Sequence, residues 1–176
     1  QRQMCIRDSV RERAEKAKEE YGTEDAKVFE DYQELIKEDL DVVYVTTPNR
    51  SHAEISIAAM EAGKDVMCEK PMAKNYAEAQ KMVEASEKTG RVLNIGYQNR
   101  YRPDSLFLKE MCKADELGEI YFAKAHALRR RAVPTWGVFL NEEEQGGGPL
   151  IDIGTHALDL TLWMICLLYT SPSPRD

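Results

Sequence analysis

The stretch Asp41-Val42-Val43-Tyr44-Val45-Thr46-Thr47-Pro48-Asn49 predicts a buried β-strand that ends in a turn. Its β-branched and almost continuously apolar residues are typical of a strand that is covered on both faces. Pro48 and Asn49 then turn the chain, and Ser51 can cap a helix that runs through Ala62. A strand followed directly by a helix is the repeating element of an α/β fold.

The same alternation extends to both sides of this stretch. Helices are expected over residues 10–21, about 31–36 and about 75–89, and strands over 26–29, 65–68 and 91–96. A helix therefore fills each gap between successive strands. This order predicts βαβ units with right-handed crossovers, and hence an α/β domain with a parallel sheet.

The regular alternation of strands and helices ends after Gly96, and a second domain is predicted from there. A helix is expected around residues 105–112, followed by a long strand-like run over 120–131. Three glycines and Pro149 precede a final helix, because a residue without an amide hydrogen suits the first helical turn. The predicted organisation is a partial parallel-sheet domain over 10–98 and the beginning of an α+β domain over 99–165.

The final helix carries an unusual set of polar residues. Asp152, His156 and Asp159 are spaced i, i+4 and i+7, which places them on one helical face. The other sides are apolar, so we expect a helix that is buried almost all round, where unpaired charges are costly. The three residues are either a satisfied ion-pair network or an active-site face. A metal site is a third alternative, but no further His or Cys lies nearby in sequence.

Polar residues also follow three predicted strands, at the edge where open parallel sheets bind ligands. Lys70 is the most informative of them. Pro71 biases Lys70 away from helical dihedral angles and leaves the bond between them open to the cis form. A lysine fixed at a strand tip beside Glu69 is poorly explained as a solvated surface charge.

Composition argues against several classes of protein. The 176 residues carry a net charge of −7, which disfavours a nucleic-acid surface, and the cluster Arg129-Arg130-Arg131 is too short to change this. No apolar run reaches the length of a membrane span, and no signal-peptide pattern is visible. The four cysteines show no close pairing, so neither a disulfide framework nor a metal ribbon is expected. We expect a protein of the reducing cytoplasm.

The two ends do not continue the pattern between them. Residues 1–9 have no clean amphipathic period, and residues 166–176 break a helical pattern into a Ser/Pro tail. Both resemble translated sequencing-adapter read-through at the edges of assembled metagenomic genes. We therefore expect residues 10–165 to be a piece of a longer gene, and both tails to pack poorly.

Three motifs together resemble the Gfo/Idh/MocA oxidoreductases, the family of glucose–fructose oxidoreductase and inositol dehydrogenase. They are Thr47-Pro48-Asn49-x-x-His52, Glu69-Lys70-Pro71 and Gly147-Gly148-x-x-x-Asp152-x-Gly154-x-His156-x-x-Asp159. The resemblance spans residues 10–163. It implies an NAD(P)-binding Rossmann domain, followed by an α/β domain whose sheet often forms the interface of a homo-oligomer.

The resemblance also implies roles for individual residues. It implies a catalytic trio of Lys70, Asp152 and His156. No metal site is expected, because no further His or Cys lies near the final helix in sequence. The residues implied to line NAD or NADP are Thr47, Pro48, Asn49, His52, Glu69, Lys70 and Gln98, and those implied to contact substrate are Arg100, Trp136, Asp152 and His156. The trio is expected to converge on one cleft.

One family motif, the phosphate-binding Gly-x-Gly-x-x-Gly, is absent from the sequence. It is expected upstream of residue 10, together with the acidic residue that contacts the ribose. NAD therefore cannot be distinguished from NADP, and we expect this chain alone to be inactive and to bind either cofactor weakly.

The whole protein is expected to oxidise a secondary alcohol of a sugar, cyclitol or related polyol by hydride transfer to nicotinamide. His156 is the candidate base, Lys70 the candidate hydrogen-bond donor to the alkoxide, and Asp152 orients the substrate or the imidazole. The alternatives are an NAD-dependent glycosidase on the same fold, a catalytically idle cofactor-binding regulator, and a Schiff-base lyase that uses Lys70.

Overall fold

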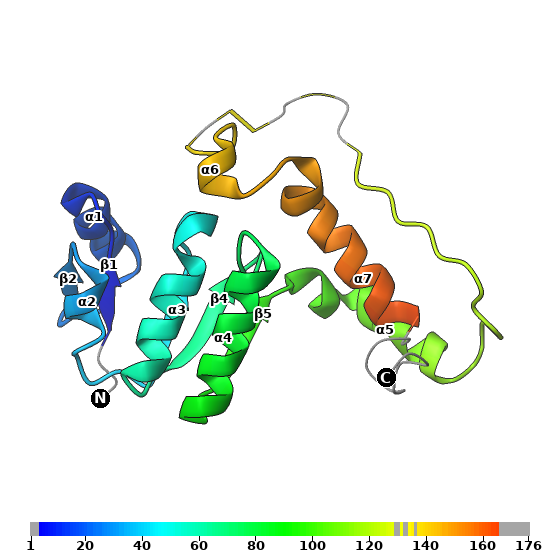
Figure 1. The fold of residues 1–176 in the computed structure, drawn as a ribbon, viewed down its shortest axis with the longest axis horizontal. Coiled ribbons are helices and arrows are strands. Elements are labelled where there is room, and N and C mark those ends of the chain that lie inside the picture. The colour runs from blue at the N-terminus through cyan, green and yellow to red at the C-terminus, as the bar shows by residue number, and fades with distance from the viewer. Residues whose placement is uncertain (1–3, 129–130, 132–133, 136, 166–176) are drawn as a thin grey trace. The chain divides into compact units, whose positions relative to one another are not determined.

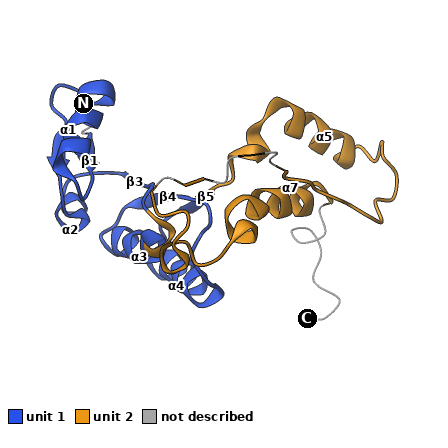
Figure 2. Ribbon diagram, turned by 90° about the horizontal axis from the view of Figure 1, so that it is seen from above, with its two compact units in different colours: residues 1–47, 51–95 blue, residues 48–50, 96–176 orange. Residues whose placement is uncertain are grey.

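The computed structural model describes residues 4–128, 131, 134–135 and 137–165 (Figure 1). The chain forms two compact units, residues 1–47 with 51–95 and residues 48–50 with 96–176 (Figure 2). The short segment 48–50 thus belongs to the second unit, although its neighbours in sequence on both sides belong to the first. The domain assignment over 10–98 and 99–165 stays a prediction. Within the described ranges, no helix is long and apolar enough to cross a membrane.

The first unit contains two parallel sheets. β1 (Cys5–Arg7) and β2 (Lys27–Phe29) pair in parallel and are connected by α1 (Arg11–Tyr21). β3 (Val42–Val45), β4 (Asp65–Glu69) and β5 (Leu93–Gly96) form the second sheet in that order. β3 and β4 are parallel, with Val45 opposite Cys68. The predicted α/β fold with parallel strands is therefore confirmed.

Two helices cover one face of the larger sheet (Figures 1 and 2). α3 (His52–Glu61) connects β3 to β4, and α4 (Tyr76–Thr89) connects β4 to β5. The core between these helices and the sheet contains the fully buried side chains of Val66, Cys68, Met60 and Met82. Apolar burial of this kind stabilises the unit, and it fixes the strand ends that follow β3 and β4.

The prediction that β3 is covered on both faces is wrong. Val43 and Val45 are buried, whereas Val42 and Tyr44 are each 55% exposed. Successive strand residues point to opposite faces, and α3 and α4 lie on the same face of the sheet. An apolar run predicts a strand, but it does not say which elements cover it.

Capping differs between the two helices. α4 is capped as expected, because the Asn75 side chain accepts a hydrogen bond from the Glu78 amide at 3.0 Å. Ser51 occupies the corresponding position of α3 but makes no capping hydrogen bond, so the predicted cap is wrong. The 3-10 turn η1 (Asn49–Ser51) gives Ser51 a helical conformation, whereas a capping residue usually has an extended one.

The prediction that residues 1–9 pack poorly is wrong for β1. Its three residues are half-buried and pair with β2, and Cys5 packs against the core. Three residues are too few to show a period, so this strand could not be predicted from periodicity. The origin of both tails stays a prediction, and residues 166–176 lie outside the described ranges.

The regular elements described in the second unit are helices. η2 (Gln98–Tyr101) leads into α5 (Pro103–Lys113), and both contact α7 (Thr155–Ile165). α6 (Glu142–Gln145) is a single turn, and the π-helical turn η3 (Leu150–Gly154) leads directly into α7.

The strand predicted over 120–131 is not formed by the residues described there, 120–128 and 131. An alternating segment becomes a strand only when a neighbour supplies its hydrogen bonds. The side chains of Tyr121 and Leu128 are 95% and 86% exposed. The segment thus keeps large apolar side chains on the surface.

Candidate functional site

Two of the predicted polar segments leave the larger sheet at the same edge. Thr46 and Thr47 follow β3, and Lys70 follows β4 directly. Because β3 and β4 are adjacent and parallel, with Val45 opposite Cys68, both segments lie at the carboxyl ends of neighbouring strands. This is the edge at which open α/β sheets bind ligands.

His52 connects these two segments. Its side chain is 1% exposed, and its Nδ1 lies 2.7 Å from the carbonyl oxygen of Pro71. Its Nε2 lies 2.8 Å from the carbonyl oxygen of Thr47. The ring thus lies between the two loops, and its predicted contact with a cofactor stays a prediction.

The hydroxyl of Thr47 offers a place for a ligand. Its Oγ1 atom is buried and has no hydrogen-bond partner among the described residues. A cavity of about 270 Å³ extends along β3 and is lined by Val45, Thr46 and Thr47, among others. A buried polar atom without a partner costs free energy, and a bound polar molecule would supply that partner. This segment therefore fits a role in holding a cofactor.

Glu69, predicted to line the cofactor, is held by a neighbouring strand. The Tyr44 hydroxyl donates to its Oε1 at 2.6 Å. This hydrogen bond, with smaller contributions from burial and from the charge of Glu69, raises the pKa of Tyr44 to about 12. The contact fixes the carboxylate immediately before Lys70, which is half-buried. Sequence reasoning missed Tyr44, because it treated that residue only as part of an apolar run.

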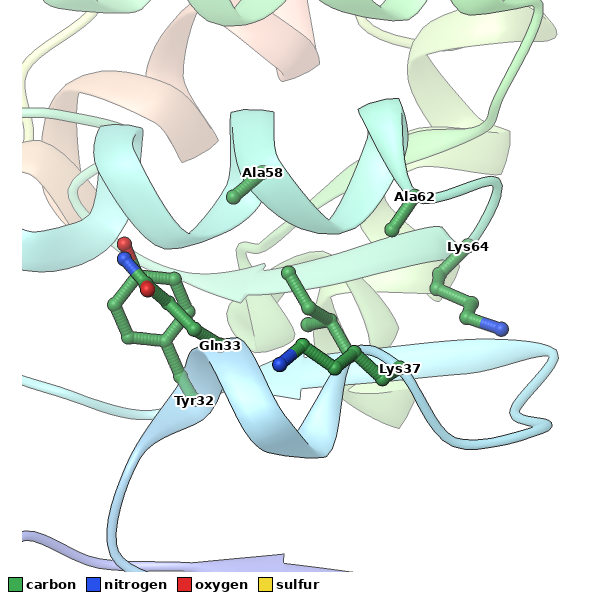
Figure 3. Close-up of a pocket in the computed structure, with 7 residues that line it drawn as sticks. Tyr32, Gln33, Lys37, Ala58, Ala62 and Lys64 are labelled. Carbon is green, nitrogen blue, oxygen red and sulfur yellow. The ribbon is translucent and has the colours of Figure 1, made fainter.

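A larger hollow in the first unit contains none of the predicted site residues. It has a volume of about 590 Å³ and lies between α2 (Tyr32–Leu35) and α3. Figure 3 shows Tyr32, Gln33 and Lys37 on one side of it and Ala58 and Ala62 on the other. The hollow is open to solvent, and its lining includes none of the residues that follow β3 or β4.

Asp152 and His156 lie where one helical form changes into another. Pro149 precedes η3, which contains Asp152, and His156 is in the first turn of α7. A π turn accommodates an additional residue and often occurs at functional sites. The predicted helix therefore forms, but its first turn departs from α-helical spacing. It is half-buried rather than buried all round, and Leu158 is 54% exposed.

Tyr97 borders His156 within the second unit. The two ring centroids are 6.5 Å apart, and the rings meet edge to face at 89°. Such a contact helps to orient an aromatic ring. His156 is half-buried, and this contact helps to position its ring. Tyr97 follows β5 directly, and sequence reasoning did not single it out.

Asp159 has a structural explanation. Arg100 Nε donates to Asp159 Oδ2 at 2.9 Å, and Arg100 Nη2 donates to Asp159 Oδ1, forming a bidentate pair. The Arg100 guanidinium also lies 5.8 Å from the ring centroids of Tyr97 and Trp163. The ion-pair interpretation thus holds for Asp159, and the substrate contact of Arg100 stays a prediction. No group of three metal-binding side chains is found in the described part of the chain.

Asn49 is held by a residue far away in sequence. Its side-chain nitrogen donates to the backbone oxygen of Gln145 at 3.0 Å and to the Gln145 Oε1 at 2.6 Å. Arg50, beside it, pairs with Glu144 at 2.6 Å. Sequence reasoning missed Gln145, because the acidic segment before the three glycines was interpreted as a loop.

The remaining predicted site residues are placed as follows. Pro48 and Gln98 are exposed, and both belong to the second unit. Trp136 lies outside the described residues. Lys70 belongs to the first unit and Asp152 and His156 to the second, and their convergence on one cleft stays a prediction.

Two family models match this chain. Residues 1–97 match GFO_IDH_MocA, described as an oxidoreductase family with an NAD-binding Rossmann fold. Residues 106–168 match the GFO/IDH/MocA C-terminal domain. The order of the two matches is the order that the motifs imply.

Individual relatives are dehydrogenases. D-glucoside 3-dehydrogenase of Escherichia coli (strain K12) is 44% identical over 163 residues, which cover 92% of this chain and 46% of the relative. Inositol 2-dehydrogenase of Salmonella typhimurium is 31% identical over 164 residues, covering 92% and 46%. The chain thus spans less than half the length of these relatives.

A solved structure is similar over the same extent. Levoglucosan dehydrogenase in complex with NADH and levoglucosan has a TM-score of 0.79 and 29% sequence identity. The similarity covers 92% of this chain and 44% of that chain.

Proposed function

This chain belongs to the Gfo/Idh/MocA family of NAD-binding oxidoreductases, and from that premise we propose that the whole protein is a sugar or polyol dehydrogenase. It oxidises a secondary alcohol of a sugar, cyclitol or related polyol, with NAD or NADP as hydride acceptor. The observation that carries the proposal is the position of Lys70 at the carboxyl end of a parallel strand, in a chain 44% identical to D-glucoside 3-dehydrogenase.

The strand-end segments of the first unit are suited to hold the cofactor. The Thr47 hydroxyl, which has no hydrogen-bond partner in the described part of the chain, supplies a polar group, and the cavity lined by Thr47 supplies space for a ligand. His52 holds the backbone on both sides of this edge, so little rearrangement is needed when a ligand binds. Preorganisation of this kind lowers the cost of binding.

The chain's own residues handle the proton and the charge on oxygen. The bound nicotinamide supplies the hydride acceptor. His156 takes the hydroxyl proton, since imidazole is the side chain best suited to act as a base at neutral pH. Lys70 donates a hydrogen bond to the same oxygen and stabilises the negative charge that develops there. Asp152, on the turn before His156, orients the substrate or the imidazole.

The whole protein assembles as a homo-oligomer through its second domain. Support comes from the segment before α6, where Tyr121, Phe122 and Leu128 expose most of their side chains. Exposed apolar side chains that gather in one segment often mark an interface. Sedimentation of the whole protein tests this, and a monomer at every concentration would contradict it.

The function is tested with the whole protein, a panel of sugars and cyclitols, and either cofactor. The proposal expects stoichiometric formation of reduced nicotinamide with at least one of these alcohols. Hydrolysis of a glycoside that needs NAD but leaves no net NADH would support the glycosidase alternative instead. Cofactor binding without turnover of any alcohol or glycoside would support an idle regulator.

A further inference from the structure

A pair of buried amide side chains joins the loop after β3 to the segment before the Asp152/His156 helix. Asn49 is 8% exposed and Gln145 is 7% exposed, and 96 residues separate them in sequence. The Asn49 side-chain nitrogen donates to two acceptors of Gln145, its backbone oxygen and its Oε1. Asn49 is therefore committed to this contact.

Each residue of this pair lies close in sequence to a part of the proposed site. Asn49 is two residues beyond Thr47 and belongs to the second unit, as Gln145 does.

Both ends of α6 are defined by local contacts. Asn141 caps its first turn, because its side chain accepts hydrogen bonds from the amides of Glu143 and Glu144. Gly146 ends α6 with φ +82°, a conformation that glycine adopts without strain.

The segment after α6 needs an external anchor. Residues 146–148 are three glycines, the residue type that loses most conformational freedom when it is ordered. Without a fixed start, they leave η3 and α7 free to shift relative to the loop that carries Asn49. The contact between Asn49 and Gln145 fixes that start within a few residues of Asp152.

We propose that Asn49 and Gln145 are positioning residues that couple the strand-end loop to the helix bearing Asp152 and His156. This inference rests on the proposed dehydrogenase function. We call the pair Asn49 and Gln145 the latch. The latch holds the segment before η3 at a fixed position relative to the loop that follows Thr47. A change in that loop is thereby transmitted to Asp152 and His156.

Arg50 provides a matched control within the same two segments. It pairs with Glu144 at 2.6 Å, but the Arg50 side chain is 59% exposed. Exposed ion pairs contribute little, whereas breaking a buried hydrogen bond leaves groups unsatisfied and costs more. Arg50→Ala should therefore have little effect on any of the measurements below.

The experiment uses the whole protein with Asn49→Ala, Gln145→Met, the double variant and the Arg50→Ala control. Gln145→Met keeps the length of the side chain and removes the side-chain acceptor Oε1, while the backbone oxygen of Gln145 stays available to Asn49. It remains informative if Asn49→Ala fails to fold. Hydrogen–deuterium exchange over residues 146–156 should rise about tenfold in Asn49→Ala, which loses both hydrogen bonds, and by a smaller factor in Gln145→Met, which keeps the backbone acceptor. The double variant should exchange no faster than Asn49→Ala, because the two residues act as one unit.

Kinetics distinguish a positioning role from a direct contact with the cofactor. Both single variants should lower kcat, Asn49→Ala by the larger factor, and leave the Kd of the cofactor unchanged. A raised cofactor Kd in Asn49→Ala alone, with exchange over 146–156 as in the unmodified protein, would overturn the latch. If the unmodified protein oxidises no alcohol, the proposed function fails. The exchange measurement then still decides the latch, and unchanged exchange in Gln145→Met would refute it.

Discussion

Tyr44 and Glu69 show how one contact changes the chemistry of a strand end. The hydrogen bond from the Tyr44 hydroxyl to Glu69 disfavours loss of the phenolic proton, and it raises the pKa of Tyr44 to about 12, from the ordinary value of 10. Because the folded-state pKa lies above the unfolded one, this contact stabilises the fold fully below about pH 10. Its contribution is lost as the pH rises through about 12.

We predict that Glu69→Gln lowers the pKa of Tyr44 towards its ordinary value. The substitution removes the charged acceptor and leaves the strand unchanged. Ultraviolet titration of tyrosine ionisation measures this shift, and Tyr44→Phe identifies the signal among the eight tyrosines. An unchanged titration in Glu69→Gln would mean that the contact does not persist in solution.

A second residue-scale prediction concerns Cys68. It is fully buried, and burial raises the pKa of its thiol to about 11. Only the thiolate reacts with alkylating agents, so Cys68 should resist iodoacetamide at neutral pH. Mass spectrometry of the native protein should find Cys112, which is half-buried, modified well before Cys68. Equal rates would contradict the buried position.

At the scale of elements, the two helices on the larger sheet differ in how they begin. The Asn75 side chain caps α4 through the Glu78 amide, whereas Ser51 leaves α3 without such a bond. We predict that Asn75→Ala destabilises the fold by about 1 kcal/mol, the usual value of a capping bond. Ser51→Ala is the matched control and should cost far less. Denaturant unfolding compares the two, and equal losses would contradict this assignment.

The elements themselves could largely be predicted from the sequence. The strand 42–45 and the helices on either side of 65–69 follow from periodicity, since apolar runs and glycine stops are local signals. What covers Val42 and Tyr44 could not be predicted, because it depends on elements distant in sequence. The strand expected over 120–131 is not formed by the residues described there, for a related reason. A strand needs a neighbouring strand to pair with, and the residues of the segment do not determine whether one is present.

At the scale of the whole molecule, the candidate residues could be named but not their contacts. Lys70, Asp152 and His156 were found from motifs. The contacts of His52 with two carbonyl oxygens and of Asn49 with Gln145 were not. Both join segments that are distant in sequence, and no local pattern encodes such a pairing. Asp159 was a candidate functional residue in the sequence, but in the structure it forms an ion pair with Arg100. Its role is therefore explained by a contact that the sequence did not reveal.

This chain alone should bind dinucleotide weakly. It contains no Gly-x-Gly-x-x-Gly, the turn whose amide groups and helix N-terminus hold the pyrophosphate. Calorimetry of residues 10–165 with NAD and with NADP should detect no binding in the micromolar range. Micromolar affinity would mean that the strand-end residues are sufficient without that turn.

We propose that His156 and Lys70 act in one reaction, His156 by proton transfer and Lys70 by charge stabilisation. The most direct measurement is kcat of the whole protein with its best polyol, compared among the unmodified protein, Lys70→Ala and His156→Ala. Each variant should lower kcat by roughly two to four powers of ten, the usual contribution of a general acid or base. The cofactor Kd should change far less. Near-normal kcat in both variants would contradict the account, because these residues would then be structural.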